Sequence, residues 1–456
     1  MTRSVTTSNP PPSILPNDAL GQDTGRKRIP FTVIDQAVHV LDTPSEPWSI
    51  QLELGLRGHL DEERLAAGVR AGMQRHPMTR ARQLPARSGD RNWWWEIVPE
   101  ADLDPLRVLE CPDDQALAFA RAELFSRSVP LVEAPPFRLW LARHPAGDRL
   151  LLNANHAAFD AFGCVRLVGS VAREYSGEPD PLPDIDLDQA RDVDSLLGPE
   201  ESKVRGRRSH MLTSKLSDLF RPPAHLAPEG GADVPGYGFH HVVLSPELTA
   251  RLDQESGPTV NDLLLAALHL SVEAWNASHG EGTGRVSVLV PVNLRPKEWR
   301  EEVVTNFVLD ARVATSSADR AEPAAVLDAI GTQSEQIKEG GGAALMEVLR
   351  GWEGLPVWAK QPLSPAVSVA GKAVDTAVLS NLGVLREPPR YGDDGETVEA
   401  FFSAPTRMPC GLSLGAVTVG DRLHLSFRFR RPQFGLDAAQ RFAARFVAEL
   451  ERVAGS

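Results

Sequence analysis

Residues 151–163 read LLNANHAAFDAFG, and they contain a histidine and an aspartate, His156 and Asp160, that are suited to acid–base chemistry. The apolar run before His156 predicts a strand that ends at the histidine. Histidine has an ordinary pKa near neutrality, so His156 can take a proton from an alcohol or an amine. Asp160 stands where a helix should begin, and there it can cap the helix or pair with a cation. Spacing alone is not distinctive, because a histidine beside a strand is more often structural.

A second set of residues suggests a serine esterase. Residues 411–415 match the GxSxG pattern with Ser413 at its centre, and Asp421 and His424 follow in the order of a catalytic triad. A nucleophile elbow needs a sharp strand-to-helix turn at the serine, yet the sequence continues as a strand to residue 419 and then forms a hairpin around Gly420. We therefore expect Ser413 to lie in a buried strand and not to act as a nucleophile.

The elements that position these residues form two patterned regions on either side of a polar middle. We expect a flexible tail over residues 1–28, a first lobe over 29–178, a linker over 179–236 and a second lobe over 237–456. Strands and helices mix in both lobes without regular βαβ alternation, which indicates an α+β protein. The linker contains a cationic cluster, Lys203, Arg205, Arg207 and Arg208.

Hydrophobic periodicity and capping residues predict the individual elements. Helices are expected over residues 60–75, 113–128, 164–175, 211–220, 245–255, 259–278, 323–338 and 436–453. Strands are expected over residues 48–56, 78–84, 93–98, 137–143, 150–154, 239–244, 285–292, 306–313, 377–382, 412–419 and 423–429. The tryptophans of residues 93–95 should alternate between core and rim.

Composition excludes several classes of protein. The 456 residues carry 48 Lys+Arg and 61 Asp+Glu, so the net charge is 48 − 61 = −13, which argues against a nucleic-acid binder. No stretch approaches the ~20 apolar residues of a membrane span, and the N-terminus has no secretory signal. The three cysteines, Cys111, Cys164 and Cys410, are widely spaced. They predict neither a disulfide framework nor a metal site, and they fit a cytoplasmic protein.

Beyond the histidine motif, the sequence resembles the chloramphenicol acetyltransferase-like superfamily, which includes nonribosomal peptide synthetase condensation domains and wax-ester synthase/diacylglycerol acyltransferases. The family motif HHxxxDG corresponds here to residues 155–161, NHAAFDA. Other matching segments follow in the family's order: Ile34-Asp35, RHP at 75–77, RAR at 80–82, PPFRL at 135–139, TVNDLLLAAL at 259–268, PVNLR at 291–295, Asn306-Phe307 and SNLG at 380–383. Together they span residues 29–456.

The resemblance implies two chloramphenicol acetyltransferase-like α/β sandwich lobes arranged in a V with a central tunnel. It implies that His156 is the catalytic histidine, and that Asp160 is a structural aspartate that pairs with Arg295. Two departures stand in the motif, where Asn155 replaces the first histidine and Ala161 replaces the glycine. The resemblance makes further residues candidates for lining the tunnel or stabilising an oxyanion, and these are Asn155, Ala161, Gly163, Ser380, Asn381 and Gly383.

The implied activity is acyl transfer from an acyl-CoA or a phosphopantetheinyl carrier protein, acting in trans, to a small-molecule alcohol or amine in natural-product biosynthesis. His156 would be the general base, without a bound cofactor or metal. A carrier protein is usually acidic, so it would need cations at the tunnel mouth, and the candidates are the linker cluster together with Lys297 and Arg300. Two alternatives remain: a wax-ester or diacylglycerol-type acyl-CoA acyltransferase, and a catalytically silent protein that binds a carrier.

Overall fold

The computed structural model describes residues 26–181, 186–192, 222–231, 236–254, 257–296, 299, 303–339, 354–360 and 375–455. Residues 1–25 of the predicted tail lie outside the described residues. Lys27 and Arg28, which the prediction placed in the tail, belong to the first strand, β1 (Lys27–Pro30). Most of the predicted linker also lies outside the described residues. That part includes its cationic cluster and the helix expected over 211–220. The cations Lys297 and Arg300 are outside the described residues as well.

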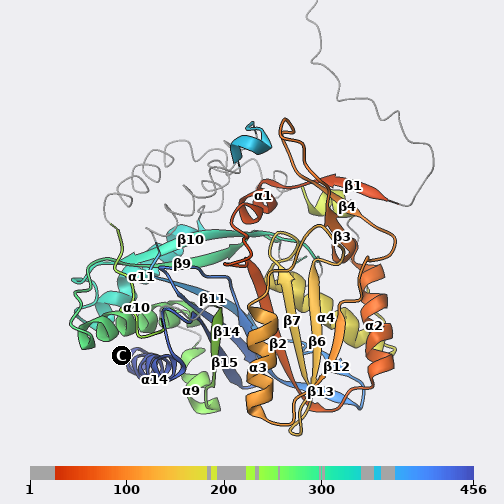
Figure 1. The fold of residues 1–456 in the computed structure, drawn as a ribbon. Coiled ribbons are helices and arrows are strands. Elements are labelled where there is room, and N and C mark those ends of the chain that lie inside the picture. Colours follow the sequence, from red (N-terminus) through yellow and green to blue (C-terminus); the bar gives the residue numbers. More distant parts are fainter. Residues whose placement is uncertain are drawn as a thin grey trace, which may run out of the picture.

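Two six-stranded sheets form the body of the protein (Figure 1). The first has the order β12-β13-β2-β7-β6-β5 and the second has the order β10-β9-β11-β14-β15-β8, which confirms the α+β class. The strands of the first sheet are β2 (Ser49–Gly58), β5 (Leu106–Glu110), β6 (Phe137–Arg143), β7 (Arg149–Asn155), β12 (Arg390–Tyr391) and β13 (Gly395–Ser403). Those of the second sheet are β8 (Tyr237–Val243), β9 (Val286–Asn293), β10 (Val308–Thr315), β11 (Ala377–Val384), β14 (Leu412–Val419) and β15 (Arg422–Arg430).

Helices cover both faces of the first sheet, because its central strands are apolar on both sides. Leu139 and Leu141 of β6 share a core with α2 (Glu62–Arg75) and α4 (Ala161–Ser176). The intervening Trp140 and Ala142 point to the opposite face and pack on α3 (Asp114–Phe125). The second sheet shares its core with α9 (Pro246–Leu252), α10 (Val260–Ser278), α11 (Pro323–Lys338) and α14 (Leu436–Ala454).

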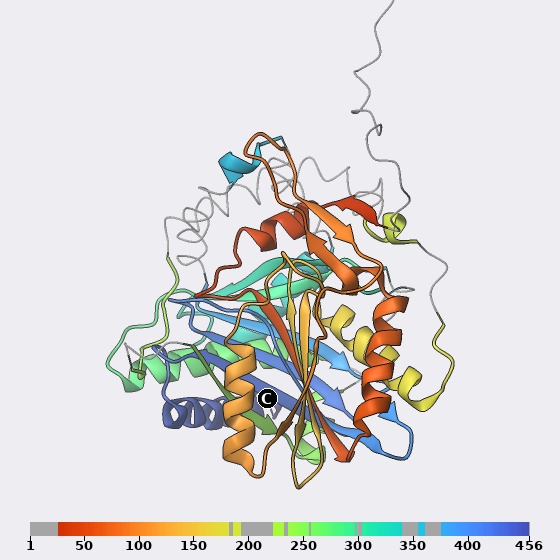
Figure 2. The same ribbon diagram turned by 45° about the vertical axis from the view of Figure 1, so that its right-hand side comes forward.

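The chain crosses between the two sheets near its C-terminal end. Strands β12 and β13 follow the second-sheet strand β11 in sequence, yet β13 pairs antiparallel with β2 of the first sheet. The chain then returns to the second sheet as β14, and Figure 2 shows these late strands running beside the first sheet. Residues of the expected second lobe therefore complete the first lobe's sheet. At this crossing a Cβ on Gly415 would lie 1.8 Å from the carbonyl oxygen of Phe402, so glycine permits the close approach.

The predicted elements agree with the observed ones at most positions, but β5, β12 and β13 were not expected, and the N-terminal region also differs. The hairpin of β14 and β15 forms around Gly420, and α4 ends at Gly177 in the left-handed conformation with φ 69°. The strand expected over residues 78–84 is wrong in its first half, which is a 3₁₀ turn before β3 (Ala81–Gln83). Helix α1 (Val33–His39) was not expected, although Thr32 and Asp35 form its capping box. In the third sheet, β4 (Trp94–Ile97) is the central strand and pairs with β1 on one side and β3 on the other.

Two smaller expectations concern apolar side chains. Trp93 and Trp95 are buried and Trp94 is 43 % exposed, so the tryptophans alternate between core and rim as predicted. Among the helices of the described residues, none combines the length and the apolar character that a membrane crossing requires.

Candidate active site

His156 lies directly after β7, at the place where the two lobes meet. Its backbone N–H donates to the carbonyl oxygen of Trp48 at 3.0 Å, which continues the pairing of β7 with β2. From the other lobe, Asn306 Nδ2 donates to the carbonyl oxygen of His156 at 2.8 Å. The backbone of the histidine is therefore held from both sides.

The hydrogen bond of the imidazole determines which ring nitrogen is free. Nδ1 lies 2.8 Å from the carbonyl oxygen of Phe159, and a carbonyl oxygen can only accept, so Nδ1 carries the proton. Nε2 is then the basic nitrogen, and no described residue forms a hydrogen bond with it. Burial lowers the pKa of His156, while the bond to Phe159 and the charge of Asp160 oppose this shift. The ring is therefore neutral at pH 7 and able to accept a proton.

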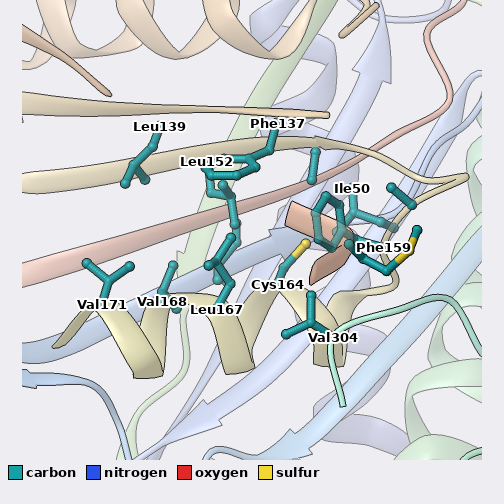
Figure 3. Close-up of a cluster of buried hydrophobic side chains, with 14 of the residues drawn as sticks. Ile50, Phe137, Leu139, Leu152, Phe159, Cys164, Leu167, Val168, Val171 and Val304 are labelled. Atoms are coloured by element: carbon teal, nitrogen blue, oxygen red, sulfur yellow. The ribbon is translucent and has the colours of Figure 1, made fainter. Parts of the chain in front are cut away.

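The core of the first lobe fixes the turn that carries this carbonyl. Phe159 is completely buried, and its ring meets the ring of Phe137 edge to face with centroids 6.1 Å apart. Figure 3 shows Phe159 among the apolar side chains of the sheet and of α4, with Cys164 and Val304 beside it. Because this anchor cannot easily rotate, the position of the Phe159 carbonyl and of the imidazole is set by packing.

Asp160 joins the two lobes through a buried ion pair. Its carboxylate lies 3.0 Å from Arg295 Nη1, and Arg295 Nη2 donates to its other oxygen at 3.1 Å. Both side chains are fully buried. The same carboxylate caps α4 through the N–H of Gly163 at 2.8 Å and accepts the N–H of Phe307 at 2.9 Å. The structure thus brings together the aspartate and the arginine that the resemblance implied.

Arg295 has further partners in the second lobe. Its Nη2 donates to the carbonyl oxygens of Val303 and Thr305 at 2.9 and 3.3 Å, and its guanidinium lies 4.6 Å from the centre of the Phe307 ring. Gly163 lies where this loop approaches α4, since a Cβ there would come within 3.2 Å of the Thr305 carbonyl oxygen. The loop over residues 303–307 is therefore clamped onto the turn that contains His156.

A cavity of about 240 Å³ opens in front of His156, between the lobes. Helix α1 lies above β9 and β10 in Figure 1, and these elements supply most of the walls. A second cavity of about 130 Å³ shares seven of these residues and adds Asp375, Thr406, Arg407 and Cys410. The first cavity is lined by Ile34, Ala37, Val38, Leu41, Trp48, His156, Leu289, Pro291, Val308, Leu309, Asp310, Arg312, Val378, Ala404 and Pro405.

The two residues that depart from the family motif, Asn155 and Ala161, both make contacts that hold the fold together. The Asn155 amide donates to Asp42 Oδ2 at 2.8 Å and to the Val129 carbonyl oxygen at 2.9 Å, while its oxygen accepts the N–H of Ala157. Asn155 is completely buried, so the expectation that it stabilises an oxyanion needs correction, because its donors are already used. Ala161 begins α4 and packs against the core of the first lobe.

The candidates on β11 lie apart from the cavity walls. Ser380, Asn381 and Gly383 are not among the residues that line either cavity, whereas Val378 of the same strand lines both. The Asn381 side chain accepts the N–H of Gly383, which has a φ of 74°, so these two residues shape a local turn. Ser380, Asn381 and Gly383 therefore do not line the cavity in front of His156, and their place in a tunnel stays a prediction.

Polar residues of the cavity were missed at the sequence level. Asp310 and Arg312 alternate along β10, which otherwise reads as an ordinary half-buried strand. Charged residues two positions apart in such a strand share one face, and this alternation was the available signal. In the part of the chain that the structure describes, no group of three His, Cys, Asp or Glu side chains converges as a metal site.

The serine motif is a strand, as expected. Ser413 is completely buried in β14, and its register partner on β15 is Arg428. Its Oγ has no hydrogen-bond partner among the described residues, and His424 Nδ1 lies 3.0 Å from the carbonyl oxygen of Arg422. These residues therefore form no triad with Ser413.

Comparisons with known proteins complete the description of the site. No family model matches the chain. Two relatives from Mycobacterium tuberculosis, uncharacterized protein Rv2305 of strain H37Rv and uncharacterized protein MT2362 of strain CDC 1551, are each 32 % identical over 423 residues. The match covers 91 % of this chain and 97 % of each relative.

Solved structures that share the fold of this chain include the following three. The first condensation domain of the calcium-dependent antibiotic synthetase has a TM-score of 0.69 at 14 % identity, with 94 % of this chain and 97 % of that chain covered. Trichothecene 15-O-acetyltransferase from Fusarium sporotrichioides has a TM-score of 0.67 at 11 % identity, covering 94 % and 96 %. The starter condensation domain of rhizomide synthetase, in complex with C8-CoA and Leu-SNAC, has a TM-score of 0.67 at 14 % identity, covering 94 % and 95 %.

Proposed function

We propose that this chain, which belongs to the same family as uncharacterized protein Rv2305 and has the fold of the condensation-domain and chloramphenicol acetyltransferase-like superfamily, transfers an acyl group from a thioester to an alcohol or an amine. One observation carries the proposal. A neutral imidazole, with its Nδ1 proton held by the Phe159 carbonyl, lines a cavity between the lobes. Its remaining nitrogen is a base that a substrate can reach.

The reaction needs one proton to move twice. Nε2 of His156 takes the proton of the acceptor hydroxyl or amine as the acceptor attacks the thioester carbonyl carbon. The tetrahedral intermediate then expels the thiolate, and the imidazolium returns its proton to that sulfur. The products are an ester or an amide and a free thiol. General-base catalysis typically contributes about 10²–10⁴-fold, and alignment of the two substrates in the cavity contributes the rest.

Asp160 and Arg295 act as positioning residues in this proposal. Their ion pair holds the loop over residues 303–307 against the turn, and Asn306 of that loop binds the backbone of His156. Neither charged group reaches the imidazole by a hydrogen bond in the described structure. They therefore act by fixing the turn from which His156 projects.

The donor is either an acyl-CoA or an acylated phosphopantetheine arm of a carrier protein. The starter condensation domain of rhizomide synthetase was solved in complex with C8-CoA, which supports a CoA thioester as the donor for this chain. We place the reaction in the cytoplasm and in natural-product biosynthesis, with the carrier protein, if used, supplied in trans. Free, buried cysteines at all three positions support a reducing compartment.

The test is acyl transfer by the purified protein. Octanoyl-CoA and a panel of alcohols and amines are mixed with enzyme, and release of the CoA thiol and the acylated product are both measured. We expect His156→Ala to lower kcat by about 10²–10⁴-fold. His240→Ala is the matched control, since His240 lies on β8, outside both cavity walls, and should leave the rate unchanged.

Two outcomes would contradict the proposal. Product formation that survives His156→Ala unaltered would show that His156 is not the base. Transfer from an octanoyl carrier protein is monitored by the intact mass of the carrier. If neither this carrier nor octanoyl-CoA donates its acyl group, a protein that only binds the carrier is favoured. A preference for long-chain alcohols alone would instead favour the wax-ester alternative.

A further inference from the structure

Asp310 places a carboxyl group in the wall of the His156 cavity. In β10, Val308, Asp310 and Arg312 alternate with the other residues and share one face of the sheet. All three line the cavity, together with Pro291, which is the register partner of Asp310 on β9. Two charged side chains, Asp310 and Arg312, therefore stand in an otherwise largely apolar part of the wall.

The two arginines in the walls of these cavities, Arg312 and Arg407, bind other groups. Arg312 is engaged with Asp375, since its Nε and Nη2 donate to the two carboxylate oxygens at 2.7 and 3.1 Å. Arg407, in the wall of the adjoining cavity, donates to the Leu41 carbonyl oxygen and lies over the Trp48 ring. Within the described residues, no side chain or backbone group donates a hydrogen bond to the Asp310 carboxylate. Burial raises its pKa to about 6, partly opposed by Arg312 and reinforced by Asp375.

The chain that leads into β10, which begins at Val308, limits the distance between Asp310 and the backbone of His156. Asn306, which binds the backbone of His156, stands four residues before Asp310. Four residues of fully extended chain span at most roughly 13 Å, so the two positions are no farther apart than this. Val308 and Pro291 line the cavity between them. A ligand with one end at His156 and the other at Asp310 would therefore cross an apolar stretch no longer than about eight to ten methylene groups.

We propose that Asp310 is a specificity-determining residue, which binds an ammonium group at the far end of the acceptor while the near end is acylated at His156. The inference rests on the proposed function and adds the class of acceptor, an amino alcohol or a related bifunctional amine. A carboxylate withdrawn from water gains more from an ammonium donor than from a neutral hydroxyl, because charge-assisted hydrogen bonds are about twice as strong. The apolar stretch between the two ends suits a hydrocarbon spacer.

The experiment compares two acceptors of the same shape. Octanoyl-CoA is the donor, and the acceptors are 8-(dimethylamino)-1-octanol, whose tertiary ammonium forms no stable amide, and 9-methyl-1-decanol, its uncharged isostere. For the unmodified protein we expect kcat/KM to be at least about ten-fold higher for the amino alcohol. Asp310→Asn should bring the two values within about three-fold, and Asp310→Leu should favour the uncharged alcohol. Asp328→Asn, on the exposed side of α11, removes a carboxylate elsewhere and should preserve the preference.

A binding measurement separates this inference from the proposed reaction. Calorimetry of 8-(dimethylamino)-1-octanol with the His156→Ala protein should show binding that Asp310→Asn, added to it, weakens at least about ten-fold. Failure of turnover with retained, Asp310-dependent binding would overturn the proposed reaction and keep the ammonium site. Equal use of both acceptors, equal losses for both in Asp310→Asn, or no binding of the amino alcohol would overturn the inference. A preference for 1,9-nonanediol over the amino alcohol would also overturn the inference, because Asp310 would then bind a neutral hydroxyl group better than an ammonium group.

Discussion

Removal of Arg295 should uncouple the two lobes and disturb the proposed catalytic histidine. In Arg295→Met the apolar stem is kept and the charge is lost, so Asp160 remains buried without its ion-pair partner. Two of its hydrogen bonds, from Gly163 and Phe307, survive the change. Breaking a buried pair by removing one partner typically costs about 3–5 kcal/mol, and we expect a loss of unfolding free energy in that range.

A double-mutant cycle measures the pair itself. Asp160→Asn keeps an oxygen that can cap α4 but removes the charge, and the double variant Asp160→Asn/Arg295→Met removes both charges together. Because neither charge is then left uncompensated, the double variant should be more stable than the sum of the single losses predicts, by about 1–3 kcal/mol. Urea denaturation, monitored by fluorescence, measures the free energies of unfolding. The kcat of each variant reports whether the imidazole keeps its position.

An exposed ion pair provides the control for this cycle. Arg57 and Glu396 lie 3.0 Å apart, and their side chains are 75 % and 43 % exposed, so Arg57→Met should cost no more than about 1 kcal/mol. The reasoning is refuted if Arg295→Met costs as little as Arg57→Met, or if the two losses in the cycle are additive within about 0.5 kcal/mol. It is also refuted if kcat is unchanged while stability falls, because the pair would then not position His156.

Three further predictions concern other buried groups. Asp310→Asn should raise the free energy of unfolding at pH 7 by up to about 3 kcal/mol. Burial raises the pKa of Asp310 from 3.8 to about 6, and each pKa unit corresponds to about 1.4 kcal/mol. Denaturation at several pH values should show that this gain disappears toward pH 4. Burial raises the pKa of Glu53, but Arg121 outweighs burial and lowers it from 4.5 to about 2, so acid titration should show this pair's stabilisation above pH 4.5 and its loss as the pH falls toward 2. Gly415→Ala should lower the melting temperature, because its Cβ would lie 1.8 Å from the Phe402 carbonyl oxygen and overpacking typically costs about 1–3 kcal/mol.

Each of these predictions has a contrary result. A pH-independent difference between Asp310→Asn and the unmodified protein would show that Asp310 does not titrate in the folded state as burial requires. If Arg121→Met leaves acid unfolding unchanged, the ion pair of Glu53 with Arg121 does not stabilise the protein against acid. Gly282→Ala is the control for Gly415→Ala, since a Cβ at Gly282 meets no atom within 4 Å, and equal melting temperatures for the two variants would contradict the close approach.

Residues close together in the chain specify the local elements and their ends. Asp61, Ser245 and Thr259 cap the helices that follow them, and the hairpin at Gly420 forms where turn residues separate two apolar strands. These features depend on residues a few positions apart, so their physical causes are visible in the sequence. The mixing of strands and helices predicted the α+β class, and the resemblance to a known family implied the meeting of Asp160 with Arg295.

The surroundings of His156, in contrast, depend on how distant parts of the chain pack together. Residues from α1, β10 and the stretch after β13 form one cavity, and the Asn155 amide donates to Asp42 and Val129. No local pattern predicts such contacts, because they join residues that are far apart in the chain and depend on how the two sheets pack. The crossing of β13 into the first sheet has the same origin, since a strand's own residues do not specify which edge it will pair with.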